Sequence, residues 1–102
     1  MRINFANKDL YDLFYATKPP KGLSLNVLQG YQKIVNFIKN TKDLQDIRSW
    51  KSLHFEKLKG DRQGQYSIAI DKSWRIILTI EKDKDGNLIL ILELTNHYTR
   101  II

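Results

Sequence analysis

The sequence predicts a single α+β domain, in which a short strand and two helices precede and pack on a meander of antiparallel strands. Three observations lead to this expectation. Apolar residues recur at helical spacing before residue 41, alternate with polar residues after residue 65, and flank an Asp-Gly pair at residues 85–86 that is typical of a hairpin. The expected order over residues 1–102 is therefore β-α-α-β-β-β, with no linker or repeat.

The first expected elements are an edge strand at residues 2–5 and a helix that begins after Asn7. Asn7 is expected to cap that helix, because its side-chain carbonyl can accept a hydrogen bond from a backbone amide of the first turn. The helix has to end before residues 19–20, both proline, since the residue before a proline avoids the helical conformation. Its apolar face comprises Leu10, Leu13 and Phe14.

A second, longer helix is expected between Ser24, its N-cap, and residues 40–41. Gly30 lies inside it and costs about 1 kcal/mol relative to alanine, which indicates close packing against another element. Residues 42–52 show no clear pattern and are expected to form a loop with one helical turn at most. The apolar stripe of the second helix comprises Leu28, Tyr31, Ile34, Val35 and Ile38.

Strand register decides which side chains of the meander share a face, because a shift of one residue reverses every side chain. We expect a three-residue turn at residues 71–73, which pairs Ile70 with Trp74 and places Arg75 on the face away from the helices. The helix-facing side chains are then Tyr66, Ile68, Ile70, Trp74, Ile76 and Leu78.

Toward its end, the last strand changes from apolar to polar residues at every second position. If its leucines face the helices, His97 lies on the same side as Arg75. If the loop around residues 85–86 contains an odd number of residues, Arg75 lies opposite Thr95. Arg75 and His97 are then diagonal neighbours. The leucines of this strand are Leu88, Leu90, Leu92 and Leu94.

The composition favours an anionic partner, either nucleic acid or an acidic protein. The chain has 17 Lys and Arg against 11 Asp and Glu, a net charge of +6 and a pI near 9.6. It has no cysteine and two histidines, so disulfides, thiolate chemistry and a His-rich or thiolate metal site are excluded, and no cofactor is expected. No stretch matches a signal peptide or a membrane span, and a cytoplasmic location is expected.

Basic side chains along the expected sheet suggest a site for a phosphodiester. Lys57, Lys59 and Arg62 lie close together in the chain, and such a cluster attracts a phosphate backbone, although a solvated turn is the alternative. Arg75 at the start of a central strand needs an anionic partner, which is either Glu93 or a phosphate. His97 is the candidate for proton transfer, because the ordinary pKa of an imidazole, about 6.5, lies near neutrality.

Two groups of side chains admit a structural role as well. His54 precedes Phe55 and the sheet, and we expect it to pack rather than to act chemically. Tyr66 and Tyr98 either stack on bases or pack against the domain. No glycine-rich phosphate loop, nucleophile elbow or metal-binding motif is present in the sequence.

The ordered set of motifs over residues 53–98 resembles the RelE/ParE superfamily, and most closely the HigB-type toxins of bacterial type II toxin–antitoxin pairs. The resemblance rests on the run LKGD at residues 58–61, the strand at residues 66–68, the run WRI at residues 74–76, and the pair His97-Tyr98. It implies a RelE-like fold and a metal-independent mRNA endonuclease that enters the ribosomal A site. There the ribose 2′-OH attacks the adjacent phosphate and the 5′-oxygen leaves.

The resemblance also implies residue roles. Lys59 and Arg75 would stabilise charge on the phosphate and His97 would be the general acid or base, while Lys57 and Arg62 would bind the RNA backbone. The implied partners are a cognate antitoxin, through which alone operator DNA is bound, and the ribosome with its mRNA.

Two alternatives remain open at this point. One is a ParE-like toxin without nuclease activity that binds DNA gyrase. The other is a weakened toxin retained for antitoxin binding and autoregulation of its operon, suggested because Thr95 and Asn96 stand where many HigB-like chains carry Asp-Tyr.

Overall fold

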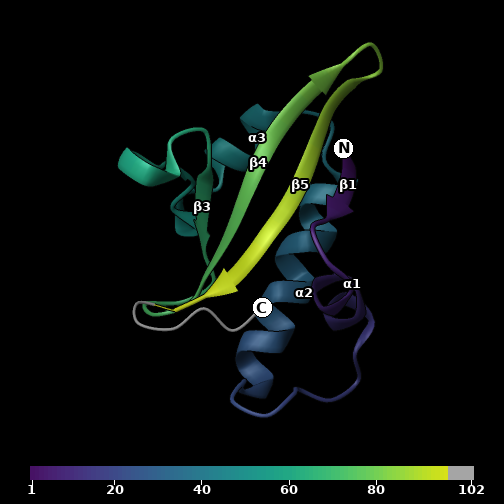
Figure 1. The fold of residues 1–102 in the computed structure, drawn as a ribbon, viewed down its shortest axis with the longest axis vertical. Helices are drawn as coiled ribbons and strands as arrows, with labels where there is room; N and C mark the ends of the chain where they lie inside the picture. Colours follow the sequence, from purple (N-terminus) through teal and green to yellow (C-terminus); the bar gives the residue numbers. More distant parts are fainter. Residues whose placement is uncertain (97–102) are drawn as a thin grey trace.

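The computed structural model describes residues 1–96 and confirms the expected α+β class. Helices cover one side of a five-stranded mixed sheet of strand order β1-β5-β4-β3-β2, in which β1 is parallel to β5 and the other pairs are antiparallel (Figure 1). The elements in chain order are β1 (Arg2–Phe5), α1 (Lys8–Tyr15), α2 (Leu25–Asn40), α3 (Leu44–Ser49), η1 (Lys51–Leu53), β2 (Glu56–Lys57), η2 (Gly60–Arg62), β3 (Tyr66–Ala69), β4 (Arg75–Asp83) and β5 (Gly86–Thr95).

The two expected helix starts are confirmed. The side-chain carbonyl of Asn7 accepts from the amide of Leu10 at 2.9 Å, and the hydroxyl of Ser24 accepts from the amide of Val27 at 3.2 Å. The buried hydroxyl of Tyr31 donates to the carbonyl of Leu10 at 2.8 Å and so links α2 to the first turn of α1. Burial also raises the pKa of Tyr31 far above its ordinary value, which keeps this donor protonated.

The segment between α2 and the sheet is more regular than the sequence indicates. Residues 42–52 were expected to be mostly loop, but they hold α3, which Asp43 caps by accepting from the amide of Asp46 at 3.2 Å, and part of η1. A helix of six residues shows only about one turn of periodicity, with Ile47 as its buried residue, and is difficult to recognise. Strand β2 is likewise too short to show alternation and was not expected.

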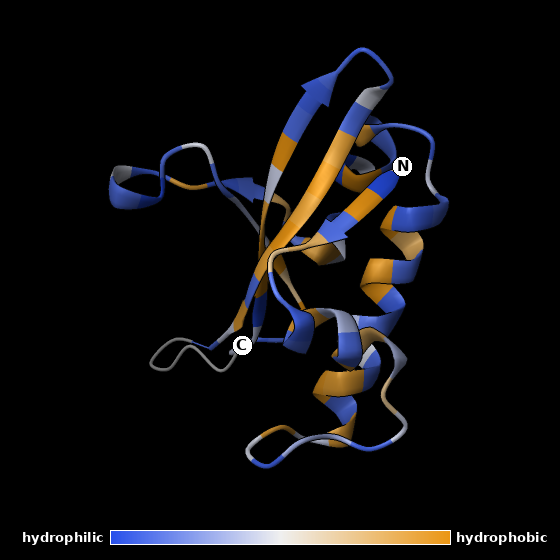
Figure 2. Ribbon diagram, turned by 45° about the vertical axis from the view of Figure 1, so that its right-hand side comes forward, coloured by the Kyte–Doolittle hydropathy of each residue, from blue (hydrophilic) through white to orange (hydrophobic). Residues whose placement is uncertain are grey.

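The core lies between the helices and the sheet, as the orange strand segments of Figure 2 indicate. The helix-facing set of β3 and β4 is confirmed, and the turn that fixes it has the expected length. Ile70 donates its backbone amide to the carbonyl of Trp74 at 2.9 Å, and the Asp71 carboxylate accepts from the amides of residues 73 and 74. The largest fully buried side chains are Tyr31, Leu10, Leu28, Ile38, Ile47, Ile68, Ile76, Leu78, Ile89, Ile91, Leu94 and Val35.

The hairpin between β4 and β5 departs from expectation in two ways that cancel. Its register pairs Asp83 with Gly86, so the turn has two residues rather than an odd number. A β-bulge then occurs at Leu92, because Leu78 pairs with Ile91 and the preceding Ile77 pairs with Glu93. The bulge restores the register that the shorter turn had shifted, and Arg75 does pair with Thr95.

The bulge also changes which residues of β5 face the helices. Before it, Ile89 and Ile91 are fully buried in the core, whereas Leu88, Leu90 and Leu92 are not; after it, Leu94 is fully buried. The expectation that all four leucines face the helices is therefore wrong for Leu88, Leu90 and Leu92 and correct for Leu94. Of the helices between residues 1 and 96, none has the length and hydrophobicity needed to cross a bilayer.

Gly30 provides a test of the packing between α2 and the sheet. A Cβ atom at this position would lie 2.6 Å from Cγ2 of Ile70, whose β-branched side chain has little rotamer freedom to move away. We expect Gly30→Ala to lower the free energy of unfolding by about 1 kcal/mol, because overpacking outweighs the gain in helix propensity. Urea denaturation measures the change. The substitution Gln29→Ala, at an exposed position of the same helix, serves as the control. A Gly30→Ala chain that is more stable than the wild type would contradict the close contact.

Candidate functional site

The side of β3, β4 and β5 that faces away from the helices carries Arg75, together with Glu93 and Thr95. Its register is fixed by two rows of pairs. Ser67, Ile77 and Glu93 form one row, and Ala69, Arg75 and Thr95 form the next. We call these six residues the site face. It confirms the expected position of Arg75 beside Thr95 on the last strand.

Arg75 lies on the site face with its side chain 31% exposed. One guanidinium nitrogen donates to the Ser67 hydroxyl at 3.3 Å and lies 4.0 Å from a carboxylate oxygen of Glu56. Both contacts are long, so donors of this guanidinium remain available to an anion. Arg75 opens into a pocket of about 390 Å³ whose lining residues are Ser52, His54, Glu56, Ala69, Ile70, Asp71, Lys72 and Arg75.

His54 is placed differently from the expectation that it packs. Its side chain is exposed and lines the pocket of Arg75, and its backbone adopts the left-handed conformation, with φ 46° and ψ 50°. It follows η1, and its backbone amide donates to the carbonyl of Lys51 at 3.1 Å. The left-handed turn directs the chain from η1 toward β2. No sequence pattern marks such a turn at a histidine, which explains why the exposure of His54 was not expected.

Glu93 does pair with an arginine, but with Arg62 rather than Arg75. Both guanidinium nitrogens of Arg62 donate to the two carboxylate oxygens of Glu93, at 2.8 and 3.0 Å. The Glu93 side chain is only 8% exposed. The hydrogen bonds and the charge of Glu93 raise the pKa of Arg62 above its ordinary value. The guanidinium of Arg62 is thus held by Glu93 within the protein, and the expected contact of Arg62 with the RNA backbone stays a prediction.

The predicted RNA-binding residues Lys57 and Tyr66 and the predicted catalytic residue Lys59 lie apart from Arg75. Lys57 pairs with Tyr66 and shares its side of the sheet, which is the helix side. Tyr66 stacks on Phe55 with ring centroids 5.2 Å apart and packs against the core, so the packing alternative holds for it. Lys59 is exposed and does not line the pocket of Arg75; it lines a shallow one of about 400 Å³ formed by Lys57, Leu58, Lys59, Gly60 and Gln63.

The predicted pair of Arg75 and His97 cannot be placed, because His97 and Tyr98 lie outside the described residues 1–96.

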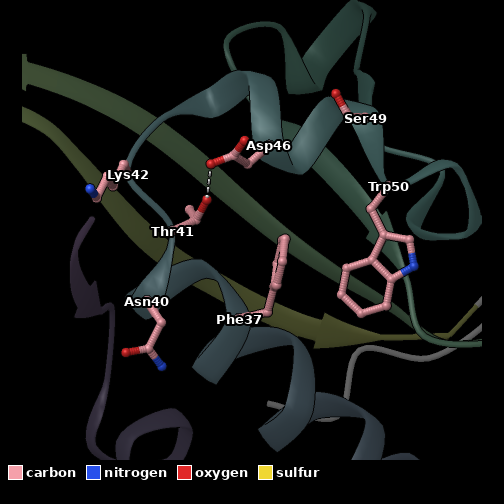
Figure 3. A pocket seen from close by; sticks show the side chains of 7 residues that line it. All are labelled: Phe37, Asn40, Thr41, Lys42, Asp46, Ser49 and Trp50. Atoms are coloured by element: carbon pink, nitrogen blue, oxygen red, sulfur yellow. Dashed lines mark hydrogen bonds between the residues drawn. The ribbon is translucent and has the colours of Figure 1, made fainter.

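A larger pocket, of about 620 Å³, lies between α2 and α3, with an aromatic wall formed by Phe37 and Trp50 (Figure 3). The hydroxyl of Thr41 donates to the carboxylate of Asp46 at its rim. Within residues 1–96, no three His, Asp or Glu side chains gather in a way that could hold a metal ion.

Residues 3–94 match the family of HigB-like toxins, described as RelE-like toxins of type II toxin–antitoxin systems. No protein of curated function matches the chain in sequence. Three solved structures share its fold. A YoeB/ParE toxin from Agrobacterium tumefaciens is 19% identical with a TM-score of 0.61, covering 96% of this chain and 100% of its own. YafQ from E. coli is 16% identical with a TM-score of 0.58, covering 95% and 94%. The YoeB–YefM complex from Staphylococcus aureus is 21% identical with a TM-score of 0.56, covering 96% and 98%.

The backbone of His54 gives a testable consequence. A left-handed conformation costs a residue with a Cβ atom about 1–2 kcal/mol, but glycine adopts it without this cost. We therefore expect the His54→Gly chain to have a higher free energy of unfolding than the His54→Ala chain, by about 1 kcal/mol. Urea denaturation of both variants measures the difference.

The exposed helical residue Gln29 supplies the matched control, since glycine there should be about 1 kcal/mol less stable than alanine. The same order of stability at both positions would contradict the left-handed turn.

Proposed function

The chain belongs to the HigB-like family, the RelE-like toxins of type II toxin–antitoxin systems, and we propose that it is a ribosome-dependent endoribonuclease that cuts mRNA in the A site. The observation that carries the proposal is the state of Arg75. This residue lines a pocket and is partly shielded from water, and its polar contacts within residues 1–96, to Ser67 and Glu56, are long. An arginine in this state suits bidentate binding of a phosphate.

The proposed reaction is transesterification within the RNA strand. The ribose 2′-oxygen loses its proton to a base and attacks the adjacent phosphorus, the bond from phosphorus to the 5′-oxygen breaks, and an acid protonates that oxygen. The products are a 2′,3′-cyclic phosphate and a free 5′-hydroxyl. Arg75 stabilises the negative charge that develops on the pentavalent phosphorus, with Lys59 as a second stabiliser from the neighbouring loop.

Two imidazoles are candidates for the proton transfers. His97 follows the last strand on which Thr95 pairs with Arg75, and its role is taken from the family order. His54 lines the pocket of Arg75 itself, which supports a second role for an imidazole there. A neutral imidazole has one nitrogen that accepts a proton and one that donates, as the two halves of this reaction require.

The proposed partners are a cognate antitoxin and the translating ribosome with its mRNA, in the cytoplasm. The S. aureus YoeB was solved with YefM, and RelBE2 of Mycobacterium tuberculosis was solved as a toxin–antitoxin complex, which supports an antitoxin for this chain. Operator DNA would be bound through that antitoxin. The net charge of +6 also suits an approach to ribosomal RNA.

Cleavage of mRNA on translating ribosomes tests the function. Purified toxin should cut mRNA within the A-site codon, and Arg75→Ala should slow cutting by about 100- to 1000-fold, because one stabiliser of the transition-state charge is lost. His97→Gln should abolish it, and His54→Gln should reduce it. Primer extension across the A site measures the cut.

Lys82→Ala, at an exposed position near the hairpin tip, serves as the control and should cut like the wild type. Undiminished cutting by both Arg75→Ala and His97→Gln would refute the assignment. Intact mRNA with gyrase-linked DNA breaks would point to a ParE-like toxin. Antitoxin binding without any effect on growth would point to a weakened toxin.

A further inference from the structure

The loop that carries Lys59 stands out from the sheet. We call residues 58–65 the Lys59 loop, which precedes β3 in Figures 1 and 2. It is closed at its base by the amide of Leu58, which donates to the carbonyl of Gln65 at 2.9 Å. Inside it, Gly60 and Gly64 adopt positive φ values of 65° and 92°. The hydrogen bond and the two glycines shape the loop, but they do not hold it against the site face.

The pair of Arg62 and Glu93 supplies that connection. Arg62 ends η2 within the Lys59 loop, which connects β2 to β3, and Glu93 lies on β5, which β4 separates from β3 in the sheet. The bond is bidentate, at 2.8 and 3.0 Å, and a third bond from Arg62 to the side chain of Gln65 at 3.0 Å fixes the same guanidinium within the loop. Arg62 therefore links the loop to the site face of β5.

The position of Glu93 in the sheet shows where the Lys59 loop is attached. Glu93 pairs with Ile77, one row away from the pair of Arg75 and Thr95 on the same face. Arg62 thus attaches the Lys59 loop to the site face one row away from Arg75. Because the carboxylate of Glu93 is nearly buried, it needs a charged partner, and a bidentate guanidinium also fixes the direction of approach.

We propose that Arg62 and Glu93 form a tether that positions Lys59 relative to Arg75, so that Arg62 is a positioning residue and not a ligand of RNA. This inference rests on the proposed nuclease function for its kinetic consequences. A shift of about 1 Å in a stabilising group can cost roughly 100-fold in rate. Loss of the tether should therefore lower the rate of cutting at saturating toxin rather than the affinity for the ribosome.

A double-mutant comparison tests the tether. Arg62→Gln and Glu93→Gln should each lower the single-turnover rate of mRNA cutting on stalled ribosomes, by an amount that approaches the loss in Lys59→Ala. In a Lys59→Ala background, Arg62→Gln should cause no further loss, because Arg62 acts through Lys59. Arg62→Lys keeps the charge without the bidentate geometry and should recover part of the rate.

A direct RNA contact by Arg62 predicts the opposite pattern. Arg62→Gln would then raise the toxin concentration for half-maximal cutting, equally with and without Lys59. Glu93→Gln would lower it, because a carboxylate that competes with phosphate is removed. Either result would overturn the tether.

Hydrogen exchange gives a readout that does not depend on activity. The backbone amides of Leu58 and Gln65 should exchange faster in Arg62→Gln and in Glu93→Gln than in the wild type, while amides of the core strands stay unchanged. The exposed pair of Arg2 and Asp83 is the matched control, since it is also bidentate, at 3.0 and 2.6 Å, but lies at the far end of β4. Arg2→Gln should alter neither the loop exchange nor the rate.

The two measurements separate the two proposals. If the wild type cuts no mRNA, the nuclease function fails, and the exchange of the Lys59 loop still decides whether the tether exists. If exchange in both variants equals that of the wild type, the tether is refuted even where cutting is observed.

Discussion

Strand β5 has to bury apolar side chains against the helices on one face and present polar side chains on the other. The rest of the structure depends on how it does so. Its first half buries Ile89 and Ile91 against the helices, and its second half buries Leu94. These residues cannot face the same side of an uninterrupted strand, because side chains alternate with a period of two. The bulge at Leu92 resolves the conflict by inserting one residue into the strand.

The same bulge determines the chemistry of the opposite face. Glu93 and Thr95 fall on the site face because Leu94 is turned inward. A carboxylate is thereby placed where water is largely excluded, and it requires a cation that reaches over the sheet. Arg62 meets that requirement, which is why the position of the Lys59 loop follows from the packing of the core.

The sequence predicted the elements with local signals. Asn7 and Ser24 cap helices as expected, and the three-residue turn after Ile70 gave the correct register between β3 and β4. The hairpin at residues 85–86 and the position of Arg75 opposite Thr95 were correct, although the length of the turn and the bulge were both missed and their shifts cancelled. A bulge is a response to tertiary packing and has no fixed sequence signal, so alternation alone could not locate it.

The candidate site was less accessible to sequence reasoning. Spacing along the chain suggested Glu93 or a phosphate as the partner of Arg75, but Glu93 binds Arg62, because the pairing depends on where the Lys59 loop folds back. His54 was dismissed because its neighbour Phe55 suggested packing, whereas a left-handed turn exposes it in the pocket of Arg75. Both errors concern contacts between segments that are distant in the chain.

Arg62 and Arg75 show why residue type alone does not assign a role. Arg62 has its guanidinium matched by both oxygens of a buried carboxylate, so a phosphate would have to displace Glu93 from two charge-assisted hydrogen bonds. Arg75 has a hydroxyl at 3.3 Å and an exposed carboxylate at 4.0 Å, both of which a phosphate can replace at little cost. The same side chain is therefore structural in one position and suited to substrate in the other. The difference arises from the burial of the acid beside it.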